Sequence, residues 1–344
     1  MFMKRFVIYL FAFLMMAAAT AQTDTNKTDA KGRKQGVWRK YDGKNLVYEG
    51  TFVNDVPTGT FTYYHKNGKV RSVCNFISGT SKVKTMLYHE NGQKSGEGIF
   101  VDQIKDGEWN YYNQNGKLIK VENYKNGEKD GQWKTFSSQT GILLEEEIYD
   151  NGILNGTQKI YFVNGELQTE INYINGKRNG NFESYYSGNV LSSKGVYHND
   201  MPIGEWSFYD GDGQIRKSEV YDKQGRLENT YLHFYNGSTP QKVNRDIIAY
   251  VRKVDDKTNV VMNTGAVFVS TDDFKYVKTL LDIDDFCPVT PNLVAANSAI
   301  RGYKQIEKDR ILVKIVPDPG YEVYSEGNEV HFVKMLFDKS PIKE

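Results

Sequence analysis

Cysteine, proline and an excess of charge of one sign are all missing or scarce in this sequence of 344 residues. The two cysteines, Cys74 and Cys287, lie in different regions, which excludes a disulfide-rich scaffold and a cysteine zinc site. We expect two separate buried thiols. The 44 basic residues balance 43 acidic ones, so the net charge is +1. Non-specific binding to nucleic acid therefore has no electrostatic basis, and no nucleic-acid partner is expected.

Motifs that carry catalysis are missing as well. No serine lies in a G-x-S-x-G turn, no glycine-rich loop carries a phosphate-binding lysine, and no Cys–His pair is indicated. His65 and His89 are expected to be solvated residues beside turns rather than metal ligands. Residues 210–213, DGDG, lack the later ligands of a calcium loop and predict a hairpin turn. We therefore expect a protein that is not an enzyme and that holds no metal and no cofactor.

One long apolar run stands at the start of the chain. Two basic residues precede the apolar stretch 6–18, and residues 19–21, ATA, form the small-x-small pattern of a cleavage site. The run is short for a membrane span, so a signal peptide over residues 1–21 is favoured over a retained anchor. We expect an exported protein that is periplasmic, cell-surface-associated or secreted, with no transmembrane anchor after cleavage. Residues 22–35 are polar and predict a flexible leader.

Glycine and tyrosine are abundant, with 31 and 24 residues, and they recur with a fixed period. The repeating unit is clearest over residues 107–130, where a strand rich in aromatic residues runs into Asn115-Gly116 and a second strand runs into Asn126-Gly127. Both dipeptides are typical of two-residue hairpin turns. The next unit begins at Gly131, 24 residues after Gly107.

Eight copies of this unit cover residues 36–227, and a degenerate ninth copy extends the array to residue 239. The opening glycine recurs at Gly36, Gly59, Gly107, Gly131, Gly156, Gly180 and Gly204, with Val83 replacing it in the third copy. The strand-end aromatic column is Phe52, Phe76, Phe100, Tyr124, Tyr149, Tyr173, Tyr197 and Tyr221. The tryptophan column is Trp38, Phe61, Thr85, Trp109, Trp133, Gln158, Phe182 and Trp206. This periodicity predicts a repeat array.

The pattern G-x-W-x-Y-Y-x-x-N-G-K-L followed by Y-x-N-G resembles the bacterial variant of the MORN repeat, as in YwqK-type antitoxins. This resemblance covers a little over half of the chain. It implies a β-meander of hairpins that acts as an interaction platform, with phospholipid binding suggested for some eukaryotic relatives. The family has no catalytic residues to carry over.

A two-residue turn at Asn115-Gly116 predicts which side chains share a face of the sheet. One face collects Trp109, Tyr111, Leu118 and Tyr124 and is apolar in every copy inspected. The other face is polar apart from a tyrosine column. Because a single layer cannot enclose a core, the apolar face must be covered by twist, by the C-terminal domain or by a second copy of the array.

The period stops near residue 240, and residues 240–344 predict a small α+β domain. We expect a helix or a strand at 243–254, a hairpin at 259–270 and a helix capped by Asp272. A second hairpin is expected at 310–324 and a last strand at 330–337. The carboxylates at Asp282, Asp284 and Asp285 are explained by a loop that follows the helix.

The fold class expected is therefore mainly β, a single-layer β-meander array followed by a small α+β domain. The function expected is that of a non-catalytic module that binds a protein partner in the envelope or associates with itself. The alternatives are an antitoxin or immunity protein, a binder of glycans or cell-wall polymer, and a small enzyme in the C-terminal domain. The ligand-binding residues predicted are one tyrosine column on the polar face: Tyr64, Tyr88, Tyr112, Tyr161, Tyr185 and Tyr209.

Overall fold

The computed structural model describes residues 25–317 and 322–338. The predicted signal peptide, residues 1–21, lies outside the described residues. The chain divides into two compact units, Met1–Ile153 and Leu154–Glu344, which are taken here one at a time.

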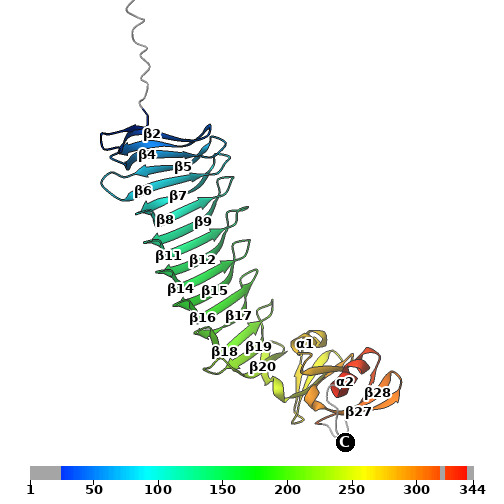
Figure 1. The fold of residues 1–344 in the computed structure, drawn as a ribbon. Coiled ribbons are helices and arrows are strands. Elements are labelled where there is room, and N and C mark those ends of the chain that lie inside the picture. The colour runs from blue at the N-terminus through cyan, green and yellow to red at the C-terminus, as the bar shows by residue number, and fades with distance from the viewer. Residues whose placement is uncertain (1–24, 318–321, 339–344) are drawn as a thin grey trace, which may run out of the picture. The chain divides into compact units, whose positions relative to one another are not determined.

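The first unit is a single layer of antiparallel strands that follow one another in sequence order (Figure 1). Successive strands pair as hairpins, which confirms the predicted mainly β meander. Its strands are β1 (Lys27–Thr28), β2 (Lys34–Asp42), β3 (Asn45–Val53), β4 (Val56–Tyr64), β5 (Val70–Phe76), β6 (Lys82–Tyr88), β7 (Lys94–Val101), β8 (Ile104–Tyr112), β9 (Leu118–Lys125), β10 (Glu128–Lys129), β11 (Gly131–Phe136), β12 (Leu143–Asp150) and β13 (Ile153–Leu154), the last reaching the unit boundary.

The turn inside most copies has three residues rather than the two predicted. In the fourth copy the Gly116 amide donates to the Asn113 carbonyl at 2.9 Å, and Gly116 alone has positive φ. This is a type I turn with a glycine bulge. A second bulge between Tyr111 and Tyr112 restores the predicted register, so Gly107 lies opposite Tyr124 and Trp109 lies opposite Glu122. Tyr112 lies opposite Leu118, so the placement of Leu118 on the tryptophan face was wrong.

The turn between copies has the two residues predicted. Asn126 and Gly127 have φ of 52° and 84°, as a type I′ turn requires. The chain then bulges at the opening glycine, and Gly107 adopts a φ of 68°. Val83 cannot adopt such a φ without strain, and β6 pairs with β5 without a bulge at this position, placing Thr85 directly opposite Cys74. The extra length goes into a longer loop over residues 77–82, where the Ile77 amide donates to the Lys82 carbonyl.

The predicted flexible leader is corrected at its C-terminal end. Lys27 and Thr28 form β1, which pairs with β2 in register Lys27–Gln35. Asp29 closes the intervening turn, because its carboxylate accepts from the Lys31 and Arg33 amides at 2.9 and 3.0 Å. The meander therefore begins before the first opening glycine.

The second unit continues with hairpins of the same kind and ends in an α+β domain (Figure 1). Its hairpin strands are β14 (Gly156–Tyr161), β15 (Leu167–Ile174), β16 (Lys177–Tyr186), β17 (Val190–His198), β18 (Met201–Tyr209), β19 (Ile215–Tyr221), β20 (Leu227–Asn236) and β21 (Thr239–Asn244). The domain adds β22 (Ile248–Val254), β23 (Lys257–Met262), β24 (Val267–Ser270), α1 (Phe274–Leu280), β25 (Phe286–Thr290), β26 (Leu293–Ala296), β27 (Ile300–Glu307), β28 (Arg310–Ile315), β29 (Glu322–Glu326) and α2 (Asn328–Asp338). A sheet of β24-β23-β22-β26-β25 and a sheet of β27-β28-β29 complete it.

Two of the element predictions for this domain need correction. Residues 248–254 form strand β22, so the strand alternative holds and the helix does not. Residues 330–337 lie in helix α2 rather than a strand, with Val330 and Val333 buried at helical spacing. Both predicted hairpins are confirmed. Helix α1 is capped by Asp273, one residue after the predicted cap.

The hydrophobic core of the second unit crosses the predicted domain boundary at residue 239. Leu232 and Phe234 of β20 and Val243 of β21 belong to the same buried cluster as β22 and β23. The ninth copy was interpreted as a terminal cap of the array, but its side chains lie inside this core. Hairpin β20–β21 thus joins the last repeats of this unit to the α+β domain.

Candidate functional site: two faces of the repeat array

Each tyrosine of the predicted column lies at the β-bulge that precedes the turn inside its copy. The six side chains are all partly buried. Three of the hydroxyl groups donate to glutamates of the same sheet. Tyr64 donates to Glu49 at 2.7 Å and Tyr112 to Glu97 at 2.7 Å. Tyr185 donates to Glu183 at 2.5 Å. The structure thus places these tyrosines at equivalent positions, but as tyrosine–carboxylate pairs.

The other members of the column have different surroundings. The Tyr88 hydroxyl lies 3.8 Å from the Met86 sulfur, a weak contact. The Tyr209 carbonyl accepts from the Tyr186 hydroxyl at 3.0 Å. Tyr161 is partly buried like the rest. Ligand binding by these six residues stays a prediction.

In the pairs Tyr64–Glu49 and Tyr112–Glu97 the pKa values of both partners are shifted, upward for the tyrosine and downward for the glutamate. Burial and the bond to Glu49 raise the pKa of Tyr64 to about 12. The bond to Glu183, together with burial, raises the pKa of Tyr185 to about 12. Conversely, hydrogen bonds from Lys94 and Tyr112 lower the pKa of Glu97. Tyr64 and Tyr112 are therefore neutral donors, and Glu49 and Glu97 are charged acceptors at neutral pH.

The opposite face is built on the tryptophan column. Trp109 is only 1 % exposed although no second layer of the described part of this unit covers it. Its indole nitrogen donates to the Ile99 carbonyl at 3.1 Å. A Cβ at Gly98 would lie 2.2 Å from the ring, so the indole lies flat on the backbone of the preceding strand. Phe61 over Gly50 and Trp206 over Gly195 repeat this arrangement.

Rings of the tryptophan column pack against the strand-end aromatics, and Phe61 and Trp133 each lie between two of them. The Phe61 ring centroid lies 5.1 Å from that of Phe52 and 5.2 Å from that of Phe76. Trp133 lies 5.3 Å from Tyr124 and 5.6 Å from Tyr149. These are edge-to-face or tilted contacts, which are favourable beyond area burial.

Basic side chains complete the cover of this face. Lys105 lies 4.8 to 5.1 Å from the ring centroids of Trp109, Tyr111 and Tyr124. Lys129 lies 4.0 Å from Trp133, and Lys34 lies 4.9 Å from Trp38. Such side chains shield apolar area with their methylene groups and attract the ring faces with their charge. In these copies, part of the cover that the apolar face requires comes from within the copy itself.

A buried carboxylate anchors this arrangement in the fourth copy. Glu122 accepts from Tyr124 at 2.7 Å and forms ion pairs with Lys105 at 3.3 Å and Lys120 at 2.9 Å. Burial acts to raise the pKa of Glu122, but the bonds from Lys120, Tyr124 and Tyr111 outweigh it and the pKa is lowered. Burial and the bond to Glu122 raise the pKa of Tyr111 and of Tyr124.

Sequence reasoning missed two columns that this geometry reveals. One is the basic residue two positions before the opening glycine: Lys34, Lys105, Lys129 and Arg178. The other is the glycine eleven positions before the large ring: Gly50, Gly98 and Gly195. Both were visible as periodic columns, but their meaning depends on which side chains meet across strands.

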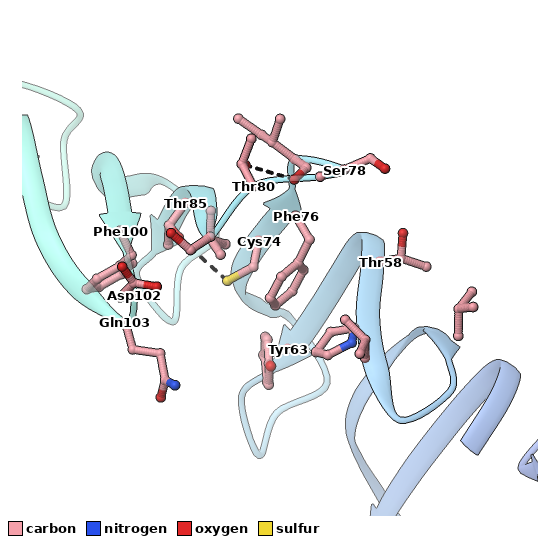
Figure 2. A pocket seen from close by; sticks show the side chains of 17 residues that line it. Thr58, Tyr63, Cys74, Phe76, Ser78, Thr80, Thr85, Phe100, Asp102 and Gln103 are labelled. Carbon is pink, nitrogen blue, oxygen red and sulfur yellow. Dashed lines mark hydrogen bonds between the residues drawn. The ribbon is translucent and has the colours of Figure 1, made fainter. Parts of the chain in front are cut away.

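The third copy interrupts this cover. Thr85 replaces the tryptophan, Ser81 replaces the lysine and Cys74 replaces the glycine. An open hollow of about 910 Å³ lies there, bordered by Phe76, Phe100 and the loop at residues 77–81 (Figure 2).

Other candidate groups have structural partners. His65 and His89 lie 3.0 and 2.8 Å from the carbonyls of Tyr88 and Tyr112, one copy further along. The 210–213 segment is a hairpin turn, with the Gly213 amide donating to the Asp210 carbonyl. Asp285 forms an ion pair with Arg245 at 3.1 Å. Across residues 25–317 and 322–338 no cluster of histidine, cysteine and carboxylate side chains is arranged to hold a metal ion.

Comparison with known proteins bears on the repeats. Residues 57–78, 105–126 and 154–175 match the family model described as MORN repeat variant, which confirms the resemblance at the second, fourth and sixth copies. Membership of the YwqK-type antitoxin group stays a prediction. No curated protein sequence matches the chain.

Two solved structures show weak likenesses. One is the LytTr DNA-binding domain of a response regulator from Bacillus cereus, with 15 % identity, a TM-score of 0.27, and coverage of 31 % of this chain and 95 % of that one. The other is the TcdB2-TccC3 structure, with 11 % identity, a TM-score of 0.18, and coverage of 84 % of this chain but 17 % of that one. Both scores are too low to bear on function.

Proposed function

We propose that this chain is an exported, non-catalytic repeat protein that binds a protein partner in the cell envelope. Repeats of the matched kind are generally protein- or membrane-binding modules. The observation that carries the proposal is the recurrence of the same aromatic groups along a single-layer sheet. Partly buried tyrosine rings offer large, rigid contact area and are enriched at protein interfaces.

The polar face is the side that suits recognition best. Three of its tyrosines, Tyr64, Tyr112 and Tyr185, are held in place by carboxylates, so a partner meets side chains that are already ordered and loses less entropy on binding. The tyrosine oxygens keep acceptor capacity after donating to the glutamates. The spacing of these groups by one copy fits an extended partner that makes the same contact several times.

Export rests on the signal-like pattern of residues 1–21. In the part of the chain that the structure covers, none of the helices has the length and apolar character needed to span a bilayer. Cleavage before Gln22 would leave the meander as the first folded element of the mature protein.

Two alternatives predict different partners. An antitoxin or immunity protein would bind and neutralise one toxin, whereas a cell-wall binder would retain glycans by stacking sugars on tyrosine rings. The second alternative is disfavoured at Tyr112, because Lys94 already lies 4.6 Å from that ring centroid. Retention on a glycan array would support it.

The test is capture of envelope proteins by the tagged mature chain, residues 22–344, followed by chemical cross-linking. Replacing Tyr88, Tyr112 and Tyr161 together with Phe removes hydroxyl groups from the polar face and keeps the rings. We expect weaker capture of the same partner.

The matched control replaces Tyr111, Tyr124 and Tyr149 with Phe on the tryptophan face. We expect unchanged capture, provided that circular dichroism shows both variants folded. Equal capture by all three proteins would refute recognition through the tyrosine column. Failure of the mature chain to enrich any envelope protein would refute the proposed function itself.

A further inference from the structure

The hollow in the third copy lies where the neighbouring copies carry a large aromatic side chain of the tryptophan column. Phe61 packs between the strand-end rings of Phe52 and Phe76, and Trp133 packs between those of Tyr124 and Tyr149. In the third copy the equivalent strand-end rings are Phe76 and Phe100, and Thr85 stands at the position of the ring. Figure 2 shows Phe76 beside Cys74 and Phe100 beyond Thr85, with no ring between them from the tryptophan column.

Three substitutions open this space together. Thr85 is short, and its hydroxyl contacts the Cys74 sulfur at 3.7 Å instead of reaching across the preceding strand. Ser81 is too short to lie over the rings as Lys105 does over Trp109. Val83 prevents the glycine bulge, and the loop at residues 77–82 forms one side of the opening.

The rim of the hollow is apolar and exposed. Val53, Val56 and Ile77 line it, and they are 51, 62 and 45 % exposed. An exposed aliphatic rim beside an aromatic floor is typical of a protein-binding surface. Among the residues that line the hollow, Asp102 alone carries a charge.

We propose that this hollow receives a tryptophan side chain of a partner polypeptide, with a basic side chain next to it facing Asp102. The proposal rests on the proposed protein-binding function and names the chemistry of one contact. The indole would occupy the place that Trp109 and Trp133 occupy in their own copies, with edge-to-face contacts to Phe76 and Phe100. The basic residue would supply the charge that Ser81 lacks, and Asp102 would attract it.

The size of the hollow favours a peptide segment over a lone ring. Pockets of roughly 300–1,000 Å³ hold drug-sized molecules, and this hollow measures about 910 Å³. It can therefore hold an indole together with its neighbouring residues.

The first experiment titrates the mature chain with a capped tetrapeptide of sequence Gly-Lys-Trp-Gly, monitored by methyl NMR. We expect saturable shifts of the methyl groups of Val56, Val83 and Thr85. Replacing the tryptophan of the peptide with leucine should weaken binding about tenfold, because two ring contacts are lost. Replacing its lysine with glutamate should also weaken binding, because glutamate and Asp102 repel one another.

Two variants of the chain test the assignment. The double variant Cys74→Gly/Thr85→Trp places an indole and a glycine at the positions that Trp109 and Gly98 hold in the fourth copy. Val83 keeps the third copy without the glycine bulge, but the new indole should still occupy the hollow and abolish peptide binding. The matched control Gln158→Trp adds a tryptophan in the same column of the sixth copy and should leave binding unchanged. If the double variant does not fold, the single variant Ser81→Lys tests the assignment of the hollow instead.

Ser81→Lys supplies the cation that Lys105 provides in the fourth copy. For a peptide without lysine, it should tighten binding two- to fivefold, because an ammonium group over an exposed ring contributes about 0.5–1 kcal/mol. A non-specific apolar surface would bind such a peptide less well after a charge is added at residue 81. That result would overturn the proposal. Equal binding to the double variant, or methyl shifts elsewhere in the chain, would also overturn it.

The outcomes separate this inference from the proposed function. If the tetrapeptide fails to bind but the mature chain still captures an envelope partner, the assignment of the hollow is wrong and the protein-binding function stands. The chain could also self-associate as its concentration rises, and Cys74→Gly/Thr85→Trp could abolish that association. This result would identify the occupant of the hollow as a second copy of this chain and would overturn the proposal of a separate partner polypeptide.

Discussion

At the scale of single residues, the tryptophan face depends on matched pairs across neighbouring strands. The indole of Trp109 lies on Gly98, and the ring of Phe61 lies on Gly50. A flat ring shields backbone that glycine leaves bare, and glycine leaves the room that the ring needs. Thr85 with Cys74 is the small counterpart of these pairs.

Gly98→Ala tests this matching. Its Cβ would lie 2.2 Å from the Trp109 ring, so the ring must shift. We expect a loss of about 1–3 kcal/mol in the free energy of unfolding, as for other overpacked sites, measured by urea denaturation. In a Trp109→Thr background the same substitution should cost far less, since Thr85 tolerates a Cβ opposite. The same loss in both backgrounds would refute the pairing.

Glu122 makes the array sensitive to acid. Its folded-state pKa is lowered, so its contribution to stability is fully present above the unfolded pKa of 4.5 and is lost as the pH falls through the folded value. Glu122→Gln should therefore be less stable than wild type at pH 7 and should lose less stability on going to pH 3. The exposed Glu108→Gln is the control and should follow the wild-type profile. Parallel profiles for all three proteins, from thermal melts across pH, would contradict the assignment.

At the scale of the hairpin, a standard copy such as the fourth combines a three-residue turn, a two-residue turn and a bulge that places the large ring. The opening glycine permits the bulge because its φ is positive, 68° at Gly107. The third copy shows the alternative, in which Val83 pairs regularly and the loop takes the extra length.

Gly107→Val should shift the fourth copy toward the regular pairing of the third copy and should lower the free energy of unfolding. A β-branched residue at positive φ is strained by about 1–3 kcal/mol, and loss of the bulge would lift Trp109 from Gly98. We expect a lower unfolding midpoint and a more exposed tryptophan by fluorescence quenching. Val83→Gly should change stability by less than about 1 kcal/mol, because no bulge depends on that position. Equal losses for the two variants would count against the role of the bulge.

At the scale of the whole molecule, two features provide the cover that was predicted for the apolar face of the sheet. Basic side chains lie over the rings in the repeats, and the last hairpin of the second unit contributes Leu232 and Phe234 to the core of the α+β domain. Arg216 reinforces that junction, with ion pairs of 2.7 Å to Asp210 and 2.8 Å to Asp272. Neither feature requires a second copy of the chain.

Removing residues 240–344 tests this account. The cut leaves β21 with one residue and exposes Leu232, Phe234 and Tyr235, which are 1, 0 and 7 % exposed in the full chain. Residues 22–239 should therefore self-associate in light scattering and bind an apolar dye, whereas residues 22–344 should be monomeric and bind little. A monodisperse truncated chain without dye binding would show that the junction does not hold the last hairpin.

Much of the array was predictable because its determinants are local. Asn126-Gly127 and the opening glycines encode turns and bulges within a few residues, and each hairpin pairs with its sequence neighbours. The two-residue turn predicted at Asn115-Gly116 was wrong, yet a compensating bulge preserved the predicted register from Gly107 to Tyr111. The candidate site was predicted only as a column of tyrosines, and their carboxylate partners come from neighbouring strands.

By itself, the sequence determined the period, the class of fold and the positions of the strands in the array. It could do so because a repeat contacts only its neighbours, so the local pattern carries most of the information. The tertiary structure decided what depends on distant segments: the helix at residues 328–338, the role of Asp272 in binding Arg216 rather than capping α1, and the hollow at Thr85. These features arise where side chains from separate strands or from non-repeating segments meet, and no single stretch of sequence specifies such a meeting.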